Sequence, residues 1–385
     1  DYELMALKFE ESETPKFNDS ARAMKIDNQE FTIYYSNECP YVEYEVKELS
    51  DYAKEKNIKL NFIKIDSLDI SNTILNANAF EKLLKKVGMK MEFIKAKTIL
   101  IKVNYGNDWY GIDYNMNLYR GCPHKCIYCD SRSNCYHIEN FDIVRGKENA
   151  LELLEQELIK KRNKGIIGIG SMSDTYNPLE KEYEQTRGAL KLISKYGYGV
   201  GIDTKSNLIL RDIDLLKEIN SKNNVIIKFT ITTPNDELSK IIEPNVCVTS
   251  ERLKVIKELS DNGIFAGIMM NPVLPFITDK EEDIKELVRL ANEYGAKFIQ
   301  TYMGMTLREN QRDYYFDRLE EHFEGLKDRY IKTYGERYNC VVPNYKYLFK
   351  VFAEECNKYG ILYKMEDIIK AYKKDNASIE QISFF

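Results

Sequence analysis

The feature that most constrains the fold is a repeated alternation of short apolar segments with amphipathic stretches of helical spacing. Apolar segments that read as strands lie at residues 114–118, 166–170, 200–203, 225–230, 264–270 and 298–303. Between them, apolar residues recur at helical spacing, as in Leu151, Leu154 and Leu158 or in Val255, Ile256 and Leu259. About six strand–helix units in succession predict an α/β fold with a parallel sheet, either open or curled into a partial barrel.

The chain is long enough for two or three domains, with 385 residues of which 43% are hydrophobic. We place a boundary at Gly88, where a charged helical stretch ends before a new strand-like segment at Phe93. Residues 1–88 then form a small α/β domain, 89–305 the sheet and its helices, and 306–385 a helical extension rich in aromatic residues. Within the first domain, a strand at 30–35, a helix at 40–54 and a strand at 58–65 predict a small βαβ unit.

Charge and cysteine content narrow the classes of function. Residues 1–88 carry the whole net charge of −5, whereas residues 89–385 hold equal numbers of basic and acidic side chains. Neither part is the basic body that non-specific nucleic-acid binding needs. No apolar segment is long enough to cross a membrane, and eight cysteines are few for a disulfide scaffold of this length. We expect a cytoplasmic protein that does not enter a membrane.

Three cysteines follow the first predicted strand with the spacing C-x3-C-x2-C, at Cys122, Cys126 and Cys129. Thiolates at this spacing can ligate three irons of a four-iron cluster and leave the fourth iron open for a substrate or cofactor. One alternative is a zinc site whose fourth ligand is Cys135, His124 or His137. The other is a set of ordinary core thiols.

The segment that contains these cysteines, including Tyr128 before the third, resembles the cluster motif of radical S-adenosylmethionine (SAM) enzymes. The resemblance implies a partial (β/α)6 barrel and a [4Fe–4S] cluster whose open iron binds SAM. Its electron, supplied by a flavodoxin-type or ferredoxin-type donor, would cleave SAM to a 5′-deoxyadenosyl radical that abstracts hydrogen from a substrate. The resemblance also counts Tyr128 among the residues around the cofactors.

The likeness extends over residues 91–345 and is greatest to the spore photoproduct lyase-like branch of that superfamily. The matching stretches are Tyr114-Asn115, Arg120-Gly121, Ser173-Asp174, Thr204-Lys205-Ser206, Phe229-Thr230, Glu243-Pro244 with Arg252, and Asn271-Pro272. By this resemblance Ser173 and Asp174 hold the SAM amino group, Lys205 the carboxylate, and Thr230 is a polar neighbour. Taken singly, the hydroxyls also suit turns or caps, and Lys205 suits a solvated loop.

Two departures from that branch bear on the activity. The lyases return a hydrogen atom through a Cys two residues before the Ser-Asp pair, relayed by a Tyr directly after the third cluster Cys. Here these positions hold Ser171 and Asp130. A serine O–H bond is far stronger than a thiol S–H bond, and a carboxylate has no hydrogen atom to give at neutral pH. We therefore expect no photoproduct repair by that route.

Two accessory segments carry weaker resemblances. Residues 30–66 look like the small thioredoxin-like module of some GNAT-family proteins, with Cys39 where a strand meets a helix but no second Cys for dithiol chemistry. The end of the chain, Gln381 to Phe385, resembles the Gln-Leu-Ser-Leu-Phe peptide with which bacterial repair proteins bind the sliding clamp. A buried tail is the alternative for the second segment, and a docking role is our expectation for the first.

The sequence thus predicts a radical SAM enzyme whose substrate and further catalytic residues are unassigned. A peptide or small metabolite is preferred as substrate to DNA, because residues 89–385 lack a net positive charge. The alternatives are a DNA repair enzyme related to spore photoproduct lyase and a non-enzymatic iron–sulfur or zinc protein.

Overall fold

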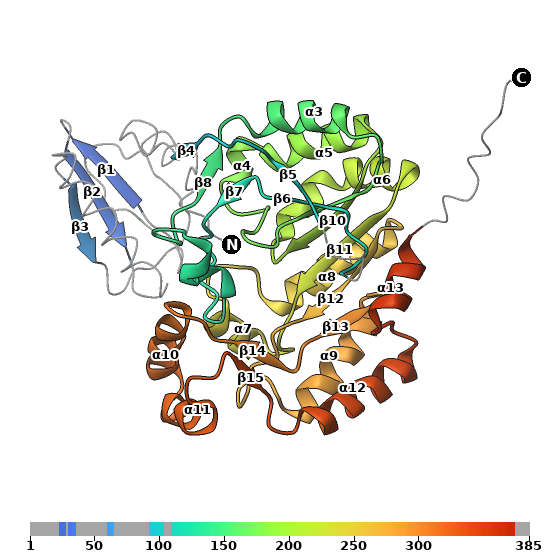
Figure 1. Ribbon diagram of the computed structural model, residues 1–385. Helices are drawn as coiled ribbons and strands as arrows, with labels where there is room; N and C mark the ends of the chain where they lie inside the picture. The colour runs from blue at the N-terminus through green and yellow to red at the C-terminus, as the bar shows by residue number, and fades with distance from the viewer. Residues whose placement is uncertain (1–22, 28–29, 36–59, 65–91, 104–108, 374–385) are drawn as a thin grey trace, which may run out of the picture. The chain divides into compact units, whose positions relative to one another are not determined.

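The computed structural model describes residues 23–27, 30–35, 60–64, 92–103 and 109–373 (Figure 1). The chain separates into two compact units, Asp1–Met91 and Glu92–Phe385. The predicted boundary at Gly88 and the C-terminal peptide 381–385 lie outside the described residues.

The first unit holds strands β1 (Ala23–Asp27), β2 (Glu30–Tyr35) and β3 (Leu60–Lys64). β2 pairs with β3 in parallel, which confirms the two predicted strands, whereas β1 pairs with β2 in antiparallel fashion and was not predicted. The helix predicted at 40–54 and Cys39 lie outside the described residues. The thioredoxin-like character of this unit therefore stays a prediction.

A seven-stranded sheet in the order β13-β12-β11-β10-β9-β6-β5 is the centre of the second unit. Its strands are β5 (Leu100–Lys102), β6 (Tyr114–Met116), β9 (Ile166–Ile169), β10 (Gly199–Thr204), β11 (Val225–Thr230), β12 (Phe265–Met270) and β13 (Ile299–Thr301). Every pair from β6 to β13 is parallel, and β5 adds an antiparallel edge. The six parallel strands follow one another in chain order without the reversal of an open doubly wound sheet. This order selects the partial barrel among the two predicted arrangements.

Helices cover the outer face of this sheet (Figure 1). They are α3 (Ala150–Lys160), α5 (Gln185–Lys195), α6 (Ile213–Lys222), α8 (Thr249–Asp261) and α9 (Glu281–Glu293), whereas the short helices α4 (Glu180–Tyr183) and α7 (Asp236–Ile242) belong to the connections that follow β9 and β11. The apolar positions that predicted them are buried, for example Leu154 and Leu158 on α3 and Ile256 on α8. Burial of these stripes against the sheet, more than intrinsic propensity, fixes the helices.

The C-terminal region carries α10 (Gln311–His322), α11 (Leu326–Tyr334), α12 (Tyr345–Tyr359) and α13 (Met365–Tyr372), as the helical prediction requires. It also contains an antiparallel pair that was not predicted, β14 (Gly304–Thr306) with β15 (Asn339–Val341). α12 packs against α9, and Leu362 bridges to Phe298 beside the end strand of the sheet. The region therefore extends the sheet layer as well as capping it.

A second small sheet and two short turns surround the cysteine segment. β8 (Arg145–Lys147) lies between β4 (Phe93–Ile94) and β7 (Tyr119–Arg120). The 3-10 turns η1 (Asp130–Arg132) and η2 (Asn134–Tyr136) follow the cysteines directly. In the part of the chain that the structure describes, no helix has the length and apolar character needed to span a bilayer.

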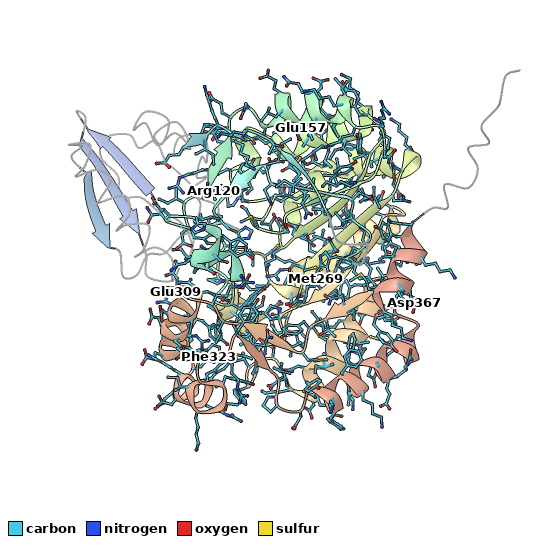
Figure 2. All side chains as sticks on the ribbon, viewed as in Figure 1. Arg120, Glu157, Met269, Glu309, Phe323 and Asp367 are labelled. Atoms are coloured by element: carbon cyan, nitrogen blue, oxygen red, sulfur yellow. The ribbon has the colours of Figure 1, made fainter. Side chains whose placement is uncertain are left out.

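Side chains of each strand alternate between the helix-covered outer face and the inner face of the curled sheet. One apolar cluster joins Ile226, Phe298 and Met269 (labelled in Figure 2) to Tyr110 and Ile112, which precede β6. The side chains of this cluster therefore lie on the inner face and fill part of it with apolar groups. The carboxyl ends of the parallel strands, where a barrel places its reactants, remain for the site.

Candidate active site

The cysteine segment is fixed by backbone hydrogen bonds at both ends. Gly121, just before the first cysteine, has a φ of +82°, and a Cβ there would lie 2.2 Å from the Ile143 carbonyl oxygen, so only glycine fits. The Cys122 amide donates to the Phe141 carbonyl at 2.7 Å, and the Ile127 amide donates to the Ile242 carbonyl at 3.0 Å. The loop is thus attached to the segment before β8 on one side and to the end of α7 on the other.

The three thiols share one environment. Cys122 and Cys126 are buried and Cys129 is half-buried. Burial raises the pKa of Cys122 to about 12, and the neighbouring Cys129 adds to that rise. Burial also raises the pKa of Cys126, which lies close enough to both other thiols for their charges to contribute. Thiols that destabilise each other's ionised forms need a bound cation centre to be thiolates together.

A set of three thiols fits an iron–sulfur cluster, since such clusters are held by Cys sulfur. Among the described residues, no three His, Cys, Asp or Glu side chains converge closely enough to hold a single metal ion. A four-iron cluster is wider than one ion, so this finding concerns a mononuclear site only. The residues present thus match the cluster that the motif predicts.

Asp174, at the end of the loop after β9, is the acidic centre of the site. Its Oδ1 accepts hydrogen bonds from the Tyr176 amide at 2.9 Å and the Thr204 hydroxyl at 2.8 Å. Its Oδ2 accepts from the Lys205 amide at 2.7 Å and lies 3.7 Å from His124 Nδ1. The carboxylate thereby connects β9, β10 and the cysteine segment, and its fixed charge suits an ammonium group.

Lys205, directly after β10, supplies the cation that faces this carboxylate. Its Nζ lies 5.9 Å from the centre of the Tyr128 ring. Burial tends to lower the pKa of Lys205, but the neighbouring Cys126, Glu243 and Asp174 reverse that effect and raise it. The ammonium group therefore stays charged, as a partner for a ligand carboxylate must.

A buried ion pair between Glu243 and Arg252 supports the cysteine segment. Tyr128 donates its hydroxyl hydrogen to Glu243 Oε1, and Glu243 Oε2 lies 2.5 Å from Arg252 Nη1. The same Arg252 nitrogen donates to the Thr230 carbonyl at 2.7 Å, and its Nε donates to the Cys247 carbonyl at 2.6 Å. Arg252 is fully buried and Glu243 nearly so. This Tyr128–Glu243–Arg252 network fixes the cysteine loop against β11 and α8.

The structure brings together all the residues that the sequence predicted for the site. Ser173 is buried and donates its hydroxyl hydrogen to the Gly121 carbonyl, at the start of the cysteine segment. Thr230 is buried at the end of β11, where its carbonyl accepts from Arg252. The Ser173 contact is made by the hydroxyl and the Thr230 contact by the backbone carbonyl. The role of each side chain toward a ligand stays a prediction.

Three further residues contact the site, and sequence reasoning had given only His124 a possible role, as a zinc ligand. His124 is buried beside Asp174, and burial lowers its pKa to about 4. Thr204 holds the Asp174 carboxylate, and the Cys247 thiol donates to the Lys205 carbonyl at 2.9 Å. His124 and Thr204 had usable signals, since His124 lies between the first two cysteines and Thr204 directly precedes Lys205 at a strand end. Cys247 meets the site only through the tertiary fold.

Ser171 and Asp130 occupy the positions of the lyase hydrogen relay, and their surroundings differ from those of the residues predicted to hold the cofactors. Ser171 is exposed. Asp130 is engaged, because its Oδ1 lies 3.0 Å from Arg308 Nε and accepts the Thr306 hydroxyl at 3.0 Å. Of the remaining cysteines, Cys340 and Cys356 are fully buried. Cys135 is exposed, with its sulfur 3.1 Å from Arg308 Nη1.

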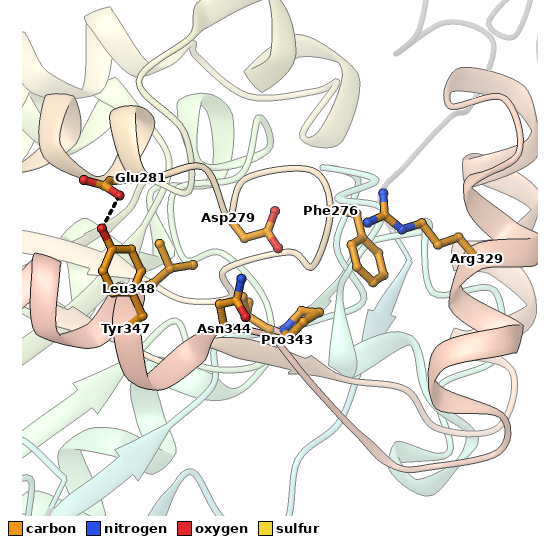
Figure 3. Close-up of a pocket in the computed structure, with 9 residues that line it drawn as sticks. Phe276, Asp279, Glu281, Arg329, Pro343, Asn344, Tyr347 and Leu348 are labelled. Carbon is orange, nitrogen blue, oxygen red and sulfur yellow. Dashed lines mark hydrogen bonds between the residues drawn. The ribbon is translucent and has the colours of Figure 1, made fainter.

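A separate cavity of about 420 Å³ lies in the C-terminal region (Figure 3). Its walls include Asp279, Glu281 and Arg329, whose guanidinium carbon lies 3.9 Å from the centre of the Phe276 ring. Tyr347 donates to Glu281 Oε2 at 2.7 Å on its opposite side (Figure 3). None of the residues predicted for the site lines this cavity.

In a comparison with known protein families, residues 116–291 match the model of the radical SAM superfamily. An uncharacterized protein of Methanocaldococcus jannaschii is 35% identical over 192 residues, which cover 49% of this chain and 71% of that protein. A protein of Pseudomonas phage M6 named as a radical SAM Nalpha-GlyT isomerase is 24% identical over 184 residues, 46% of this chain and 38% of its own length.

Among solved structures, a mutant spore photoproduct lyase with bound AdoMet and dinucleoside spore photoproduct is similar, with a TM-score of 0.54. The match has 14% sequence identity and covers 86% of this chain and 97% of the lyase chain. A second lyase mutant gives a TM-score of 0.55 at 15% identity over the same shares. At this identity the likeness concerns the fold.

Proposed function

Because the chain belongs to the radical SAM superfamily, whose members use a [4Fe–4S] cluster and SAM, we propose that it is an enzyme that cleaves SAM reductively. When bound, the cluster supplies one electron that converts SAM to a 5′-deoxyadenosyl radical, which abstracts hydrogen from a substrate C–H bond. The observation that carries the proposal is the convergence of three thiols with Asp174 and Lys205 at the carboxyl end of the sheet.

In this proposal, different residues of the chain hold the cluster and SAM. Cys122, Cys126 and Cys129 are the cluster ligands in this proposal. Asp174 receives the SAM ammonium group, since its carboxylate is fixed by donors from two strands. Lys205 receives the SAM carboxylate, since its ammonium group stays charged. The side chains of Ser173 and Thr230 then border SAM with hydroxyls.

Tyr128, Glu243 and Arg252 act as positioning residues in this proposal. Their network attaches the residue before Cys129 to the backbone of Thr230. A fixed distance between the cluster ligands and β11 keeps SAM in one orientation relative to the inner face of the sheet. Accurate orientation of reacting groups contributes several kcal/mol to catalysis in general, roughly 7–11 kcal/mol at the upper end.

A peptide or a small metabolite is the substrate that we prefer. Residues 89–385 hold balanced charges, which offers no net attraction to a phosphate backbone. Repair of DNA remains the alternative substrate reaction, supported by the fold likeness to spore photoproduct lyase. Turnover of an oligonucleotide that contains the photoproduct would favour repair, and it would require a hydrogen donor other than Ser171 or Asp130.

Anaerobic reconstitution with iron and sulfide, followed by dithionite and SAM, tests the proposed reaction. We expect 5′-deoxyadenosine to form, and we expect Cys126→Ala to abolish it while Cys356→Ala, which removes a packed thiol, does not. A protein that binds metal but leaves SAM intact would contradict the proposal and favour a non-enzymatic iron–sulfur or zinc protein.

The physiological partners follow from the same reaction. A flavodoxin-type or ferredoxin-type protein would supply the electron, and its ability to replace dithionite is the corresponding test. A reducing cytoplasm suits a protein with free thiols. Residues 1–88 as a docking domain and residues 381–385 as a sliding-clamp peptide remain proposals that deletion variants and clamp-binding measurements would test.

A further inference from the structure

The cysteine loop is held on a second side by the segment that leads from β14 into α10. This segment, residues 306–314, contacts residues 125–134, which contain two of the three proposed cluster ligands. α10 thereby lies beside the turn η1 that follows Cys129 (Figure 1). We call residues 306–314 the α10 arm. The arm lies beyond residues 116–291, which match the superfamily model, and it follows the last strand of the central sheet.

Gln311, the first residue of α10, is the centre of the α10 arm. Its Nε2 donates to the Tyr128 carbonyl at 3.0 Å and to the Thr306 carbonyl at 2.8 Å. Its Oε1 accepts the Arg308 amide at 2.9 Å, and the side chain is fully buried. Because both polar atoms of the amide have partners, its orientation is fixed.

The peptide unit between Tyr128 and Cys129 is held at both of its polar groups. Its carbonyl oxygen accepts the hydrogen bond from Gln311. Its amide, which belongs to Cys129, donates to the Cys126 carbonyl at 3.2 Å. A change at Gln311 would therefore reach the backbone of the third cysteine through a single peptide unit.

Two further side chains of the α10 arm hold the loop on either side of that peptide unit. Asn310 Nδ2 donates to the Arg132 carbonyl at 3.1 Å. The Tyr314 hydroxyl donates to the Lys125 carbonyl at 3.3 Å, and the centre of its ring lies 3.8 Å from the Arg132 guanidinium carbon. The arm thus contacts the loop before and after Cys129.

The α10 arm and the network of Tyr128, Glu243 and Arg252 hold different parts of the same residue. The network binds the side chain of Tyr128, whereas Gln311 binds its carbonyl oxygen. The two supports come from separate elements, with Arg252 on α8 and Gln311 on α10. A ligand loop that is fixed independently through side chain and backbone keeps one geometry, as a precise metal site requires.

We propose that Gln311 is a positioning residue for the iron–sulfur cluster and that the α10 arm completes the cofactor site. The inference rests on the proposed function, because that function assigns the cluster to Cys122, Cys126 and Cys129. Gln311 acts through the backbone of Tyr128 and Cys129, so it is not itself a ligand. Partners that orient metal ligands are worth roughly 10–100-fold in metal affinity or activity.

Three variants separate this role from a general effect on the fold. Gln311→Leu removes the amide at nearly constant volume. Asn310→Gly removes the donor to Arg132; Asn310 is exposed and has a φ of +67°, which glycine adopts readily, so this variant should fold. Tyr198→Phe is the control, since its buried hydroxyl donates to the Leu158 carbonyl at 3.0 Å, away from the arm. If melting shows that Gln311→Leu is unfolded, Asn310→Gly decides.

Hydrogen–deuterium exchange of residues 122–132, measured by mass spectrometry on the protein without iron, is the first measurement. We expect Gln311→Leu to raise the exchange rate of this segment about tenfold, because the loop loses a hydrogen bond that holds it. Asn310→Gly should raise it by a smaller factor, and Tyr198→Phe should not change it. Unchanged exchange in both arm variants would overturn the proposal.

The reconstituted protein provides the second measurement, as the rate of iron release to EDTA and the KM for SAM in 5′-deoxyadenosine formation. For Gln311→Leu we expect iron release to be about tenfold faster and KM to be about tenfold higher. Partial unfolding would lower the amount of active protein, and with it the apparent kcat, but it would leave KM unchanged. Unchanged iron release and KM in both arm variants, or equal changes in Tyr198→Phe, would overturn the proposal.

The same samples distinguish failure of this inference from failure of the proposed function. If the unmodified protein forms no 5′-deoxyadenosine, the proposed function is contradicted, and the rate of iron release decides the inference. If the unmodified protein forms the product and the arm variants match it in iron release and KM, only the inference is contradicted.

Discussion

The two faces of the central sheet are built from the same strands but follow different rules. On the outer face, Ile202, Ile227 and Ile268 are fully buried beneath helices such as α6 and α8. On the inner face near the carboxyl end, the corresponding side chains are Asp203 and Lys228. The outer face contributes stability by burying apolar area. The inner face holds the charged pair of Asp203 and Lys228.

This difference shows that one-residue alternation separates stability from chemistry within a single strand. β11 places Ile227 against helices and its neighbour Lys228 toward the inner face, beside Asp203. A change on one face should therefore alter unfolding, and a change on the other should alter ligand binding or catalysis. Variants on each side test how complete that separation is.

The largest effect is expected where the inner face meets the cysteine segment. Cys126→Ala removes one of three proposed cluster ligands, so the cluster should not assemble and formation of 5′-deoxyadenosine should cease. Iron content, the visible absorption of the reconstituted protein and product formation are the measurements. Cys356→Ala is the control for loss of a buried thiol. Full activity of Cys126→Ala would show that the cluster is held elsewhere.

The next largest effect is expected for the buried ion pair of Arg252 and Glu243. Arg252→Met leaves Glu243 buried without its cation, which should lower the free energy of unfolding by about 3–5 kcal/mol. Urea unfolding measures it. The double variant Arg252→Met, Glu243→Gln removes the orphaned charge and should regain part of the loss. If the double variant is as unstable as the single one, packing rather than charge determines the stability at this place.

A comparison of one outer and one inner residue tests the separation directly. Ile227→Ala should lower the free energy of unfolding by about 2–5 kcal/mol, since it leaves a cavity beneath the helices. Gln300 lies on the inner face, in register with Met269. Gln300→Leu should change the free energy of unfolding by less than about 1 kcal/mol, because it removes the unpaired Oε1 acceptor as well as the hydrogen bond that Nε2 donates to the Thr301 carbonyl. Similar losses for both, measured by urea unfolding, would show that the inner face also determines stability.

The smallest effect is expected at the surface, away from both faces. Lys285 and Glu281 form a pair one turn apart on α9, with Nζ and Oε1 2.5 Å apart. Solvent and salt screen such exposed pairs, so Lys285→Ala should leave the melting temperature unchanged within error. A clear drop would mean that Glu281, which also accepts from Tyr347, stabilises the C-terminal helices through this pair.

Periodicity was sufficient to predict the body of the fold. The residues at 225–230 form β11 as predicted, and the apolar stripes of α3, α6, α8 and α9 are buried. The short strands β7 and β15 were not predicted. They lie outside the repeated strand–helix alternation, and each is a strand because a partner lies beside it.

The candidate site was predictable where its residues adjoin strand ends or carry the cysteine spacing. Asp174 and Lys205 meet as expected, with the Lys205 amide donating to the carboxylate. The contact of Tyr128 with Glu243 joins residues 115 positions apart in the sequence. No local pattern encodes such a contact, because it depends on how α7 approaches the cysteine loop. The unpaired amide oxygens of Asn117 and Gln300 could not be predicted for the same reason.

The hydrogen bond from Gln311 to the Tyr128 carbonyl has a consequence for biogenesis. The donor follows the acceptor by 183 residues, and it lies on α10, beyond the whole sheet. A ribosome therefore makes the cysteine loop long before it makes the helix that holds it. Stable loading with iron and sulfide should therefore await synthesis of the chain through α10.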